Sequence, residues 1–127
     1  MSPAEQHLKR AEELADLAAR LLEHSHLADA VSRAYYAMFH AATAVPGHLS
    51  IERNSHHALW AAFGESVVRP GLMDPKYHRY GLDMLSARQE ADYLAEPQVS
   101  LDAAQEQVNL AKEFVLACKQ FLKQAAS

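Results

Sequence analysis

Four polar side chains recur at helical spacing within an apolar stretch, and they are the residues of this sequence best suited to chemistry. Asp29, Arg33, Tyr36 and His40 follow one another at intervals of four, three and four residues, so a helix presents all four on one side. Arg33 and His40 then lie about 10 Å apart along the helix axis. An arginine binds a phosphate through its bidentate guanidinium, and a histidine exchanges protons near neutral pH. These four residues, here called the polar stripe, are a candidate surface for binding a phosphate group and transferring a proton beside it.

The polar stripe also has a purely structural interpretation. Its neighbours in the sequence are almost all apolar, and a helix that is apolar nearly all round belongs in the centre of a bundle. An arginine in such a helix costs desolvation energy unless an anionic group meets it. In this interpretation Arg33 pairs with Asp29 or with a carboxylate from another helix, and His40 is a hydrogen-bonded core histidine. The spacing leaves both interpretations open.

A second group of polar residues lies toward the end of the chain. Arg88 and Asp92 are four residues apart, a spacing at which an ion pair forms easily on a helix. The pair would either fix its helix against the helix of the polar stripe or offer Arg88 as a second phosphate contact. Tyr93, the next residue, would lie in the core or at the edge of a groove.

The eight histidines raise the question of a metal site. A helical di-metal site needs two Glu-x-x-His pairs, whereas this chain has that spacing once, from Glu23 to His26, at the predicted end of a helix. The adjacent His56 and His57 would point in two directions from a helix. The sequence also lacks a glycine-rich phosphate loop, a Gly-x-Ser-x-Gly elbow and a Cys-x-x-Cys pair. We therefore expect no metal and no cofactor.

The elements that must position these residues are helices. Ser2, Pro3 and Glu5 form an N-terminal capping signal, Asp74-Pro75 opens a later helix in the same way, and Ser100 caps the last one. No segment alternates with period two for long enough to be a strand. The predicted helices therefore run over about 2–23, 27–45, 55–68, 75–94 and 101–122. Pro46-Gly47 would end the second helix, so 46–54 is the longest irregular stretch.

Composition agrees with one all-α domain over residues 1–127, an antiparallel helical bundle of about five helices. The 127 residues are half hydrophobic with only four glycines and five prolines, and they suffice for one core but not for two. The net charge of −4 argues against indiscriminate binding to polyanions, although residues 33–88 carry six basic against four acidic side chains. The single cysteine, the absence of an apolar run of about 20 residues and the absence of a secretion signal predict a cytoplasmic protein without a membrane span.

Two motifs carry a family resemblance. The run Ser-Arg-Ala-Tyr-Tyr-Ala-Met-Phe-His-Ala-Ala at 32–42 resembles the core motif of HEPN-domain proteins. Arg-Gln-Glu-Ala-Asp-Tyr at 88–93 resembles the signature of a small stand-alone HEPN subgroup, and Ser55-His56-His57 followed by Phe63 fits it as well. The resemblance covers nearly the whole chain in the right order. It implies a five-helix bundle, usually a two-fold homodimer, that partners a minimal nucleotidyltransferase in a toxin–antitoxin or defence pair.

The resemblance also implies an activity for the polar stripe. Many HEPN proteins are metal-independent ribonucleases with an arginine and a histidine separated by four to six residues, and Arg33 and His40 are separated by six. These two would be catalytic. The residues implied to bind RNA or a nucleotide are Asp29, Tyr36, His56, Arg88, Asp92 and Tyr93.

Two positions depart from the pattern of active HEPN members. Ala34 follows the arginine, where a polar residue is common, and Ala41 and Ala42 replace the His-x-Tyr extension that carries a modifiable tyrosine in some toxins. The alternative is therefore a non-catalytic module that binds a nucleotide or docks a nucleotidyltransferase partner without breaking a bond.

Overall fold

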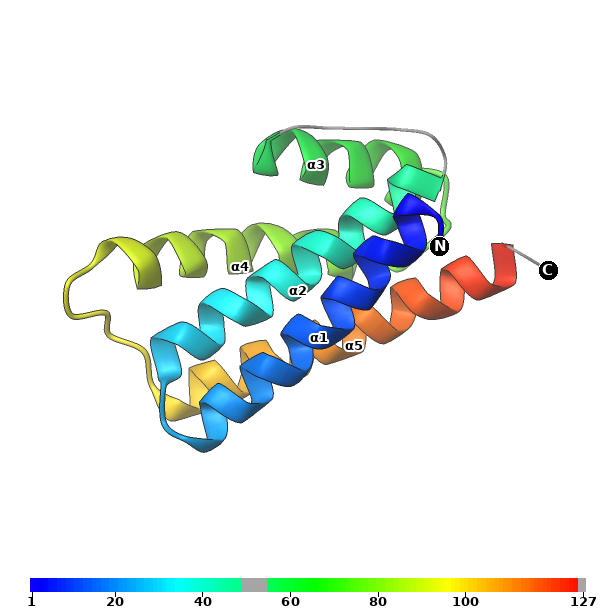
Figure 1. The fold of residues 1–127 in the computed structure, drawn as a ribbon. Helices are drawn as coiled ribbons and strands as arrows, with labels where there is room; N and C mark the ends of the chain where they lie inside the picture. The colour runs from blue at the N-terminus through cyan, green and yellow to red at the C-terminus, as the bar shows by residue number, and fades with distance from the viewer. Residues whose placement is uncertain (49–54, 126–127) are drawn as a thin grey trace.

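Helices make up the architecture of the computed structural model, which describes residues 1–48 and 55–125 (Figure 1). No strand occurs within these residues, so the prediction of an all-α bundle of five helices is confirmed. The elements are α1 Pro3–Glu23, α2 Leu27–His48, α3 His56–Phe63 continued by one π-helical segment η1 Gly64–Val68, α4 Lys76–Tyr93 and α5 Leu101–Ala125. α1 and α2 run antiparallel, as do α3 and α4.

The helix starts follow the capping signals in the sequence. The Ser2 side chain accepts a hydrogen bond from the Glu5 amide (3.1 Å), while the Glu5 carboxylate accepts one from the Ser2 amide (3.3 Å). The Ser100 hydroxyl accepts from the Ala103 amide (3.1 Å) at the start of α5. Each of these bonds satisfies an amide that the first turn of a helix leaves without a backbone partner, so the predicted starts are confirmed.

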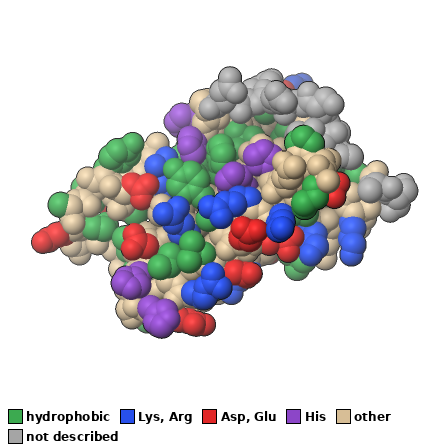
Figure 2. Space-filling view, in the orientation of Figure 1, with side chains coloured by type: hydrophobic (Ala, Val, Ile, Leu, Met, Phe, Trp, Pro, Cys, Tyr) green, Lys and Arg blue, Asp and Glu red, His purple; other side chains and the backbone are tan. Residues whose placement is uncertain are grey.

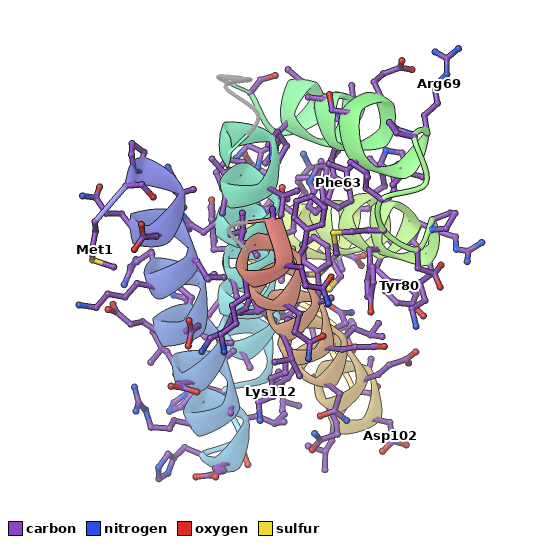
Figure 3. All side chains as sticks on the ribbon, turned by 90° about the vertical axis from the view of Figure 1, so that its right-hand side faces the viewer. Met1, Phe63, Arg69, Tyr80, Asp102 and Lys112 are labelled. Carbon is purple, nitrogen blue, oxygen red and sulfur yellow. The ribbon has the colours of Figure 1, made fainter. Side chains whose placement is uncertain are left out.

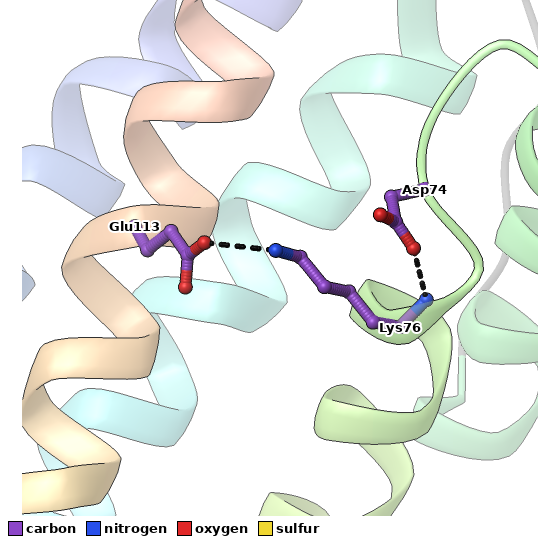
Figure 4. Close-up of polar contacts among 3 residues, drawn as sticks. All are labelled: Asp74, Lys76 and Glu113. Carbon is purple, nitrogen blue, oxygen red and sulfur yellow. Dashed lines mark hydrogen bonds and ion pairs between the residues drawn. The ribbon is translucent and has the colours of Figure 1, made fainter.

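The start of α4 is held from two directions (Figure 4). Asp74 accepts a hydrogen bond from the backbone amide of Lys76 (2.9 Å), the capping role expected of Asp74 before Pro75. The Lys76 ammonium donates to the Glu113 carboxylate of α5 (3.1 Å). The first turn of α4 is therefore tied to its own cap and to the neighbouring helix.

The predicted end of the second helix was wrong. α2 continues through Pro46 to His48 instead of ending before it. A proline removes one hydrogen bond of the helix ladder and crowds the preceding turn, but here it lies in the last turn and is fully buried, so only one bond near the end is lost. Of the predicted irregular stretch 46–54, residues 49–54 lie outside the described residues.

The core surrounds α2, which packs against α1, α4 and α5. Its largest buried side chains come from several helices and include Tyr35 and Met38 of α2. Phe63 of α3 lies against Phe114 of α5, with ring centroids 5.5 Å apart, whereas Arg69 projects away from the bundle (Figure 3). A Cβ atom on Gly81 of α4 would overlap the buried ring of Trp60. No helix in the described part of the chain has both the length and the apolar character of a membrane span.

Candidate functional site

Arg33 of the polar stripe lies open to solvent. Both Arg33 and Asp29 are exposed on α2, and no ion pair between described residues includes either of them. The pairing considered for Arg33, with Asp29 or with a carboxylate of another helix, is therefore not formed within 1–48 and 55–125. The guanidinium keeps its donors available for an external anion.

His40, two turns further along α2, is half-buried against α1. Its Nδ1 lies 3.0 Å from Nδ1 of His7, and the two rings stack with centroids 5.3 Å apart. Burial lowers the pKa of His40 below its usual value, and the positive charges of a protonated His7 and of Arg10 lower it further. His40 is therefore a neutral imidazole at pH 7, as a general base must be.

His7 is not among the site residues predicted from the sequence. This residue lies 33 positions before His40 on another helix, and no local spacing relates the two. The only available signal was its place on α1, one residue before Leu8 of the apolar face, which puts His7 at the edge of the buried side.

Arg88 lies against the aromatic residues of α2. It forms the predicted ion pair with Asp92 at 3.1 Å, with its side chain 11% exposed and that of Asp92 35% exposed. Its guanidinium carbon is 5.7 Å from the ring centre of Tyr35 and 5.5 Å from that of Tyr36, within the range of a cation–π interaction. The ion pair lies within α4, and Arg88 contacts α2 through the two tyrosine rings. Arg88 Nε is buried and has no hydrogen-bond partner among the described residues.

His56 reaches the same region from the start of α3. The indole of Trp60 donates a hydrogen bond to the Tyr35 hydroxyl (3.2 Å), which lies 2.7 Å from His56 Nδ1. Burial raises the pKa of Tyr35, so its hydroxyl keeps a proton and His56 Nδ1 is the acceptor that it meets. Burial, Arg88 and His57 lower the pKa of His56. His56 is therefore neutral and carries its proton on Nε2.

Tyr36 links the polar stripe to these neighbours. Its ring lies 6.1 Å from that of His56 and 6.4 Å from that of Phe39, and the guanidinium of Arg88 is also in contact with it. We call Tyr35, Tyr36, His56, Arg88 and Asp92 the Arg88 cluster. The structure thus brings three helices together around one half-buried tyrosine.

Not every predicted site residue joins this arrangement. Tyr93 is 79% exposed at the last position of α4, and Asp29 is exposed in the first turn of α2. On the face shown in Figure 2, histidine side chains lie over the start of α3 and over the middle of the molecule, where α1 and α2 run side by side, with lysine and arginine side chains next to them.

Two other chemistries have little support in the described residues. No three His, Cys, Asp or Glu side chains there lie close enough together to hold a metal ion. Cys118 is buried on α5, and burial raises the pKa of its thiol, so it is not a ready nucleophile. The groups available for chemistry are an exposed guanidinium, two neutral imidazoles and a partly exposed phenol.

The chain is similar to known proteins over most of its length. It matches the HEPN domain family over residues 4–121. A UPF0332 protein of Gloeobacter violaceus is 32% identical over 126 residues, which cover 98% of this chain and 100% of that protein. A UPF0332 protein of Pyrococcus horikoshii is 40% identical over 76 residues, 60% of this chain and 54% of that protein. A Methanocaldococcus jannaschii protein that bears the name "Putative toxin" is 32% identical over 114 residues, 90% of this chain and 84% of that protein.

These matches extend well beyond the two motifs noted in the sequence. They agree with the observed helical bundle, and the family expected from the resemblance is confirmed. The chain therefore belongs to the HEPN domain family and to the UPF0332 proteins.

Proposed function

We propose that this protein binds RNA through the polar stripe and cleaves it without a metal ion, as the toxin of a toxin–antitoxin or defence pair in the cytoplasm. One observation carries the proposal: an exposed arginine, which pairs with no carboxylate among residues 1–48 and 55–125, shares one side of α2 with a histidine held neutral by its surroundings. The name of the Methanocaldococcus relative supports the toxin role.

Each catalytic residue has a defined task in this reaction. Arg33 binds the non-bridging oxygens of a phosphodiester and offsets the charge that develops on them. His40 accepts the proton of the ribose 2′-hydroxyl, whose oxygen attacks the phosphorus and expels the 5′-oxygen. The products are a 2′,3′-cyclic phosphate and a 5′-hydroxyl. We further propose a homodimer, as the family resemblance implies, in which the same histidine of the second copy protonates the leaving oxygen.

The Arg88 cluster would hold the neighbouring nucleotide. The partly exposed Tyr36 offers a ring on which a base can stack, and His56 offers an Nε2–H donor. Arg88 adds positive charge beside them, although Asp92 occupies part of its guanidinium. Asp29 and Tyr93, exposed at the ends of their helices, would contact RNA at the edges of this surface.

The test is cleavage of RNA in the presence of a chelator. We expect His40→Ala and Arg33→Ala each to lower the cleavage rate at least about a hundredfold, since each removes a group that acts in the transition state. His26→Ala is the matched control, because His26 is exposed in the turn between α1 and α2. Cleavage at the native rate by either stripe variant would rule out the ribonuclease proposal.

A non-catalytic role is the second candidate, and one observation favours it. Ala34, the residue after the arginine, is fully buried, so the polar residue common at this place in active members has no counterpart near the stripe. In this case the stripe binds a nucleotide or docks a minimal nucleotidyltransferase. Wild-type protein would then bind RNA or a nucleotide without cleaving RNA, and Arg33→Ala would weaken that binding.

A further inference from the structure

The contact between His7 and His40 joins the two long helices of the first hairpin. Each ring is half-buried, and the two Nδ1 atoms are 3.0 Å apart. Such a distance is a hydrogen bond only if one nitrogen carries a proton and the other does not. Among the described residues, no other side chain forms a hydrogen bond with the ring of His40.

Counting protons restricts the states of this pair. Two neutral imidazoles carry two N–H protons in total. One proton lies between the Nδ1 atoms, so the other occupies Nε2 of only one ring. The ring that donates from Nδ1 is left with a bare Nε2, which is a base, and the accepting ring carries its proton on Nε2.

We propose that His7 is the positioning residue of His40: it accepts a hydrogen bond from His40 Nδ1 and thereby holds the ring with a bare Nε2 directed at the substrate. The catalytic consequence of this inference rests on the proposed function. The hydrogen bond itself, and a measurement of which ring donates it, do not depend on any activity. The contact follows from the stacked rings and the 3.0 Å distance between the Nδ1 atoms. We assign His40 as the donor because a general base whose Nδ1 is occupied accepts through Nε2.

The proton balance of the proposed step is complete. The proton of the 2′-hydroxyl moves to His40 Nε2, the oxygen–phosphorus bond forms, and the bond to the 5′-oxygen breaks as that oxygen takes a proton from the second histidine of the dimer. His40 becomes an imidazolium whose Nδ1–H still points at His7 Nδ1. A neutral acceptor orients this imidazolium without the large upward pKa shift that a carboxylate would cause.

No anionic group among the described residues acts on the ring of His40. The charged and titratable groups that act on His40 are His7 and Arg10, both on α1. Neither is an anion, and together with burial they lower the pKa of His40. His40 therefore remains a base at a pH where a carboxylate-paired histidine would be protonated.

Three substitutions of His7 separate positioning from mere packing. We expect His7→Ala to lower kcat for RNA cleavage about tenfold with a smaller change in KM, because α1 accepts alanine but the ring loses its partner. His7→Asn restores most of kcat, since its amide oxygen takes nearly the place of Nδ1. His7→Asp moves the acidic limb of the pH–rate profile upward, because a carboxylate stabilises the imidazolium. The exposed His26→Ala leaves kcat unchanged.

A second measurement decides the inference independently of activity. In the wild-type protein at neutral pH, nitrogen-15 NMR should show His40 protonated at Nδ1 and bare at Nε2, and His7→Ala should shift this population toward the Nε2–H form. A His40 that carries its proton on Nε2 in the wild type, or one unaffected by His7→Ala, overturns the inference even if RNA is cleaved. Absence of cleavage together with the expected tautomer overturns only the ribonuclease proposal. If the protein is active, a native kcat and an unchanged pH profile in all three His7 variants also overturn the inference that His7 positions His40.

Discussion

Two half-buried histidines have Nδ1 atoms with different partners, and this difference suits them to opposite tasks. His56 lies against Tyr36, and His40 is four residues after Tyr36 on α2. His56 Nδ1 accepts from the Tyr35 hydroxyl, so its Nε2 carries a proton and can donate to a ligand. His40 Nδ1 meets His7, and in the proposed arrangement its Nε2 is bare and can accept. One surface would thus offer a hydrogen-bond donor and a base within the same group of side chains, both neutral at pH 7.

The hydroxyl of Tyr35 can be tested by its removal. In Tyr35→Phe the indole N–H of Trp60 and the Nδ1 atom of His56 lose the partner that they share. Leaving a buried donor unsatisfied costs about 1–3 kcal/mol, so we expect the free energy of unfolding, measured in urea, to fall by about 2 kcal/mol.

Tyr36→Phe is the matched control for this substitution. Tyr36 is the neighbouring tyrosine, half-buried, and no hydrogen bond of its hydroxyl is formed with a described residue. We expect its free energy of unfolding to change by less than about 0.5 kcal/mol. Equal losses in the two variants would contradict the role given to the Tyr35 hydroxyl.

At the scale of single helices, sequence reasoning succeeded where the signal is local. Ser2 with Glu5, and Ser100, mark helix starts because their side chains bond to amides three residues away. It failed at Pro46, since a local rule treats proline as a stop whereas burial against the rest of the bundle holds the last turn of α2 in place. The ion pair of Arg88 with Asp92 was predictable for the same local reason as the caps.

The docking of α4 on α2 depends on the buried guanidinium of Arg88. The Arg88 side chain is 11% exposed and lies against two tyrosine rings, so truncating it removes packing, cation–π attraction and the ion pair together. We expect Arg88→Ala to lower the free energy of unfolding by about 2 kcal/mol, measured by urea denaturation.

Arg69→Ala provides the comparison, since Arg69 pairs with Glu65 over the same 3.1 Å. In this pair the carboxylate lies four residues before the arginine, whereas in the Arg88 pair it lies four residues after. The Arg69 side chain is 77% exposed. An exposed pair contributes little, so we expect a loss below about 0.5 kcal/mol. If the free energy of unfolding fell equally in Arg88→Ala and Arg69→Ala, burial against the tyrosine rings would not explain the contribution of Arg88.

At the scale of the whole molecule, the site exists only because distant segments meet. His7 comes from α1, the polar stripe from α2, His56 from α3 and Arg88 from α4. The periodicity of one helix can show that Arg33 and His40 share a side, but it cannot show whether that side faces water or a neighbour. That choice is made by how helices pack, which is why the exposure of Arg33 and the partner of His40 were not predictable.

The same burial makes the stability of the whole molecule depend on pH. The pKa values of His40 and His56 are both lowered in the folded state, below about 6.5 for an unfolded chain. The unfolded state therefore binds more protons in mildly acidic solution, and the free energy of unfolding falls as the pH decreases through this range. We expect a continuous loss of stability from about pH 7.5 to 5.5, before the carboxylates titrate.

The double variant His40→Asn, His56→Asn tests whether these two residues cause that loss. Asparagine does not titrate, and its amide can replace each lost hydrogen bond at Nδ1. Urea denaturation at several pH values should therefore show a shallower decline in the double variant than in the wild type. The exposed His24 and His26, changed together to asparagine, serve as the control and should leave the slope unaltered. The slope of the free energy of unfolding against pH is proportional to the number of protons taken up on unfolding. If the double variant kept the wild-type slope, these protons would bind to residues other than His40 and His56.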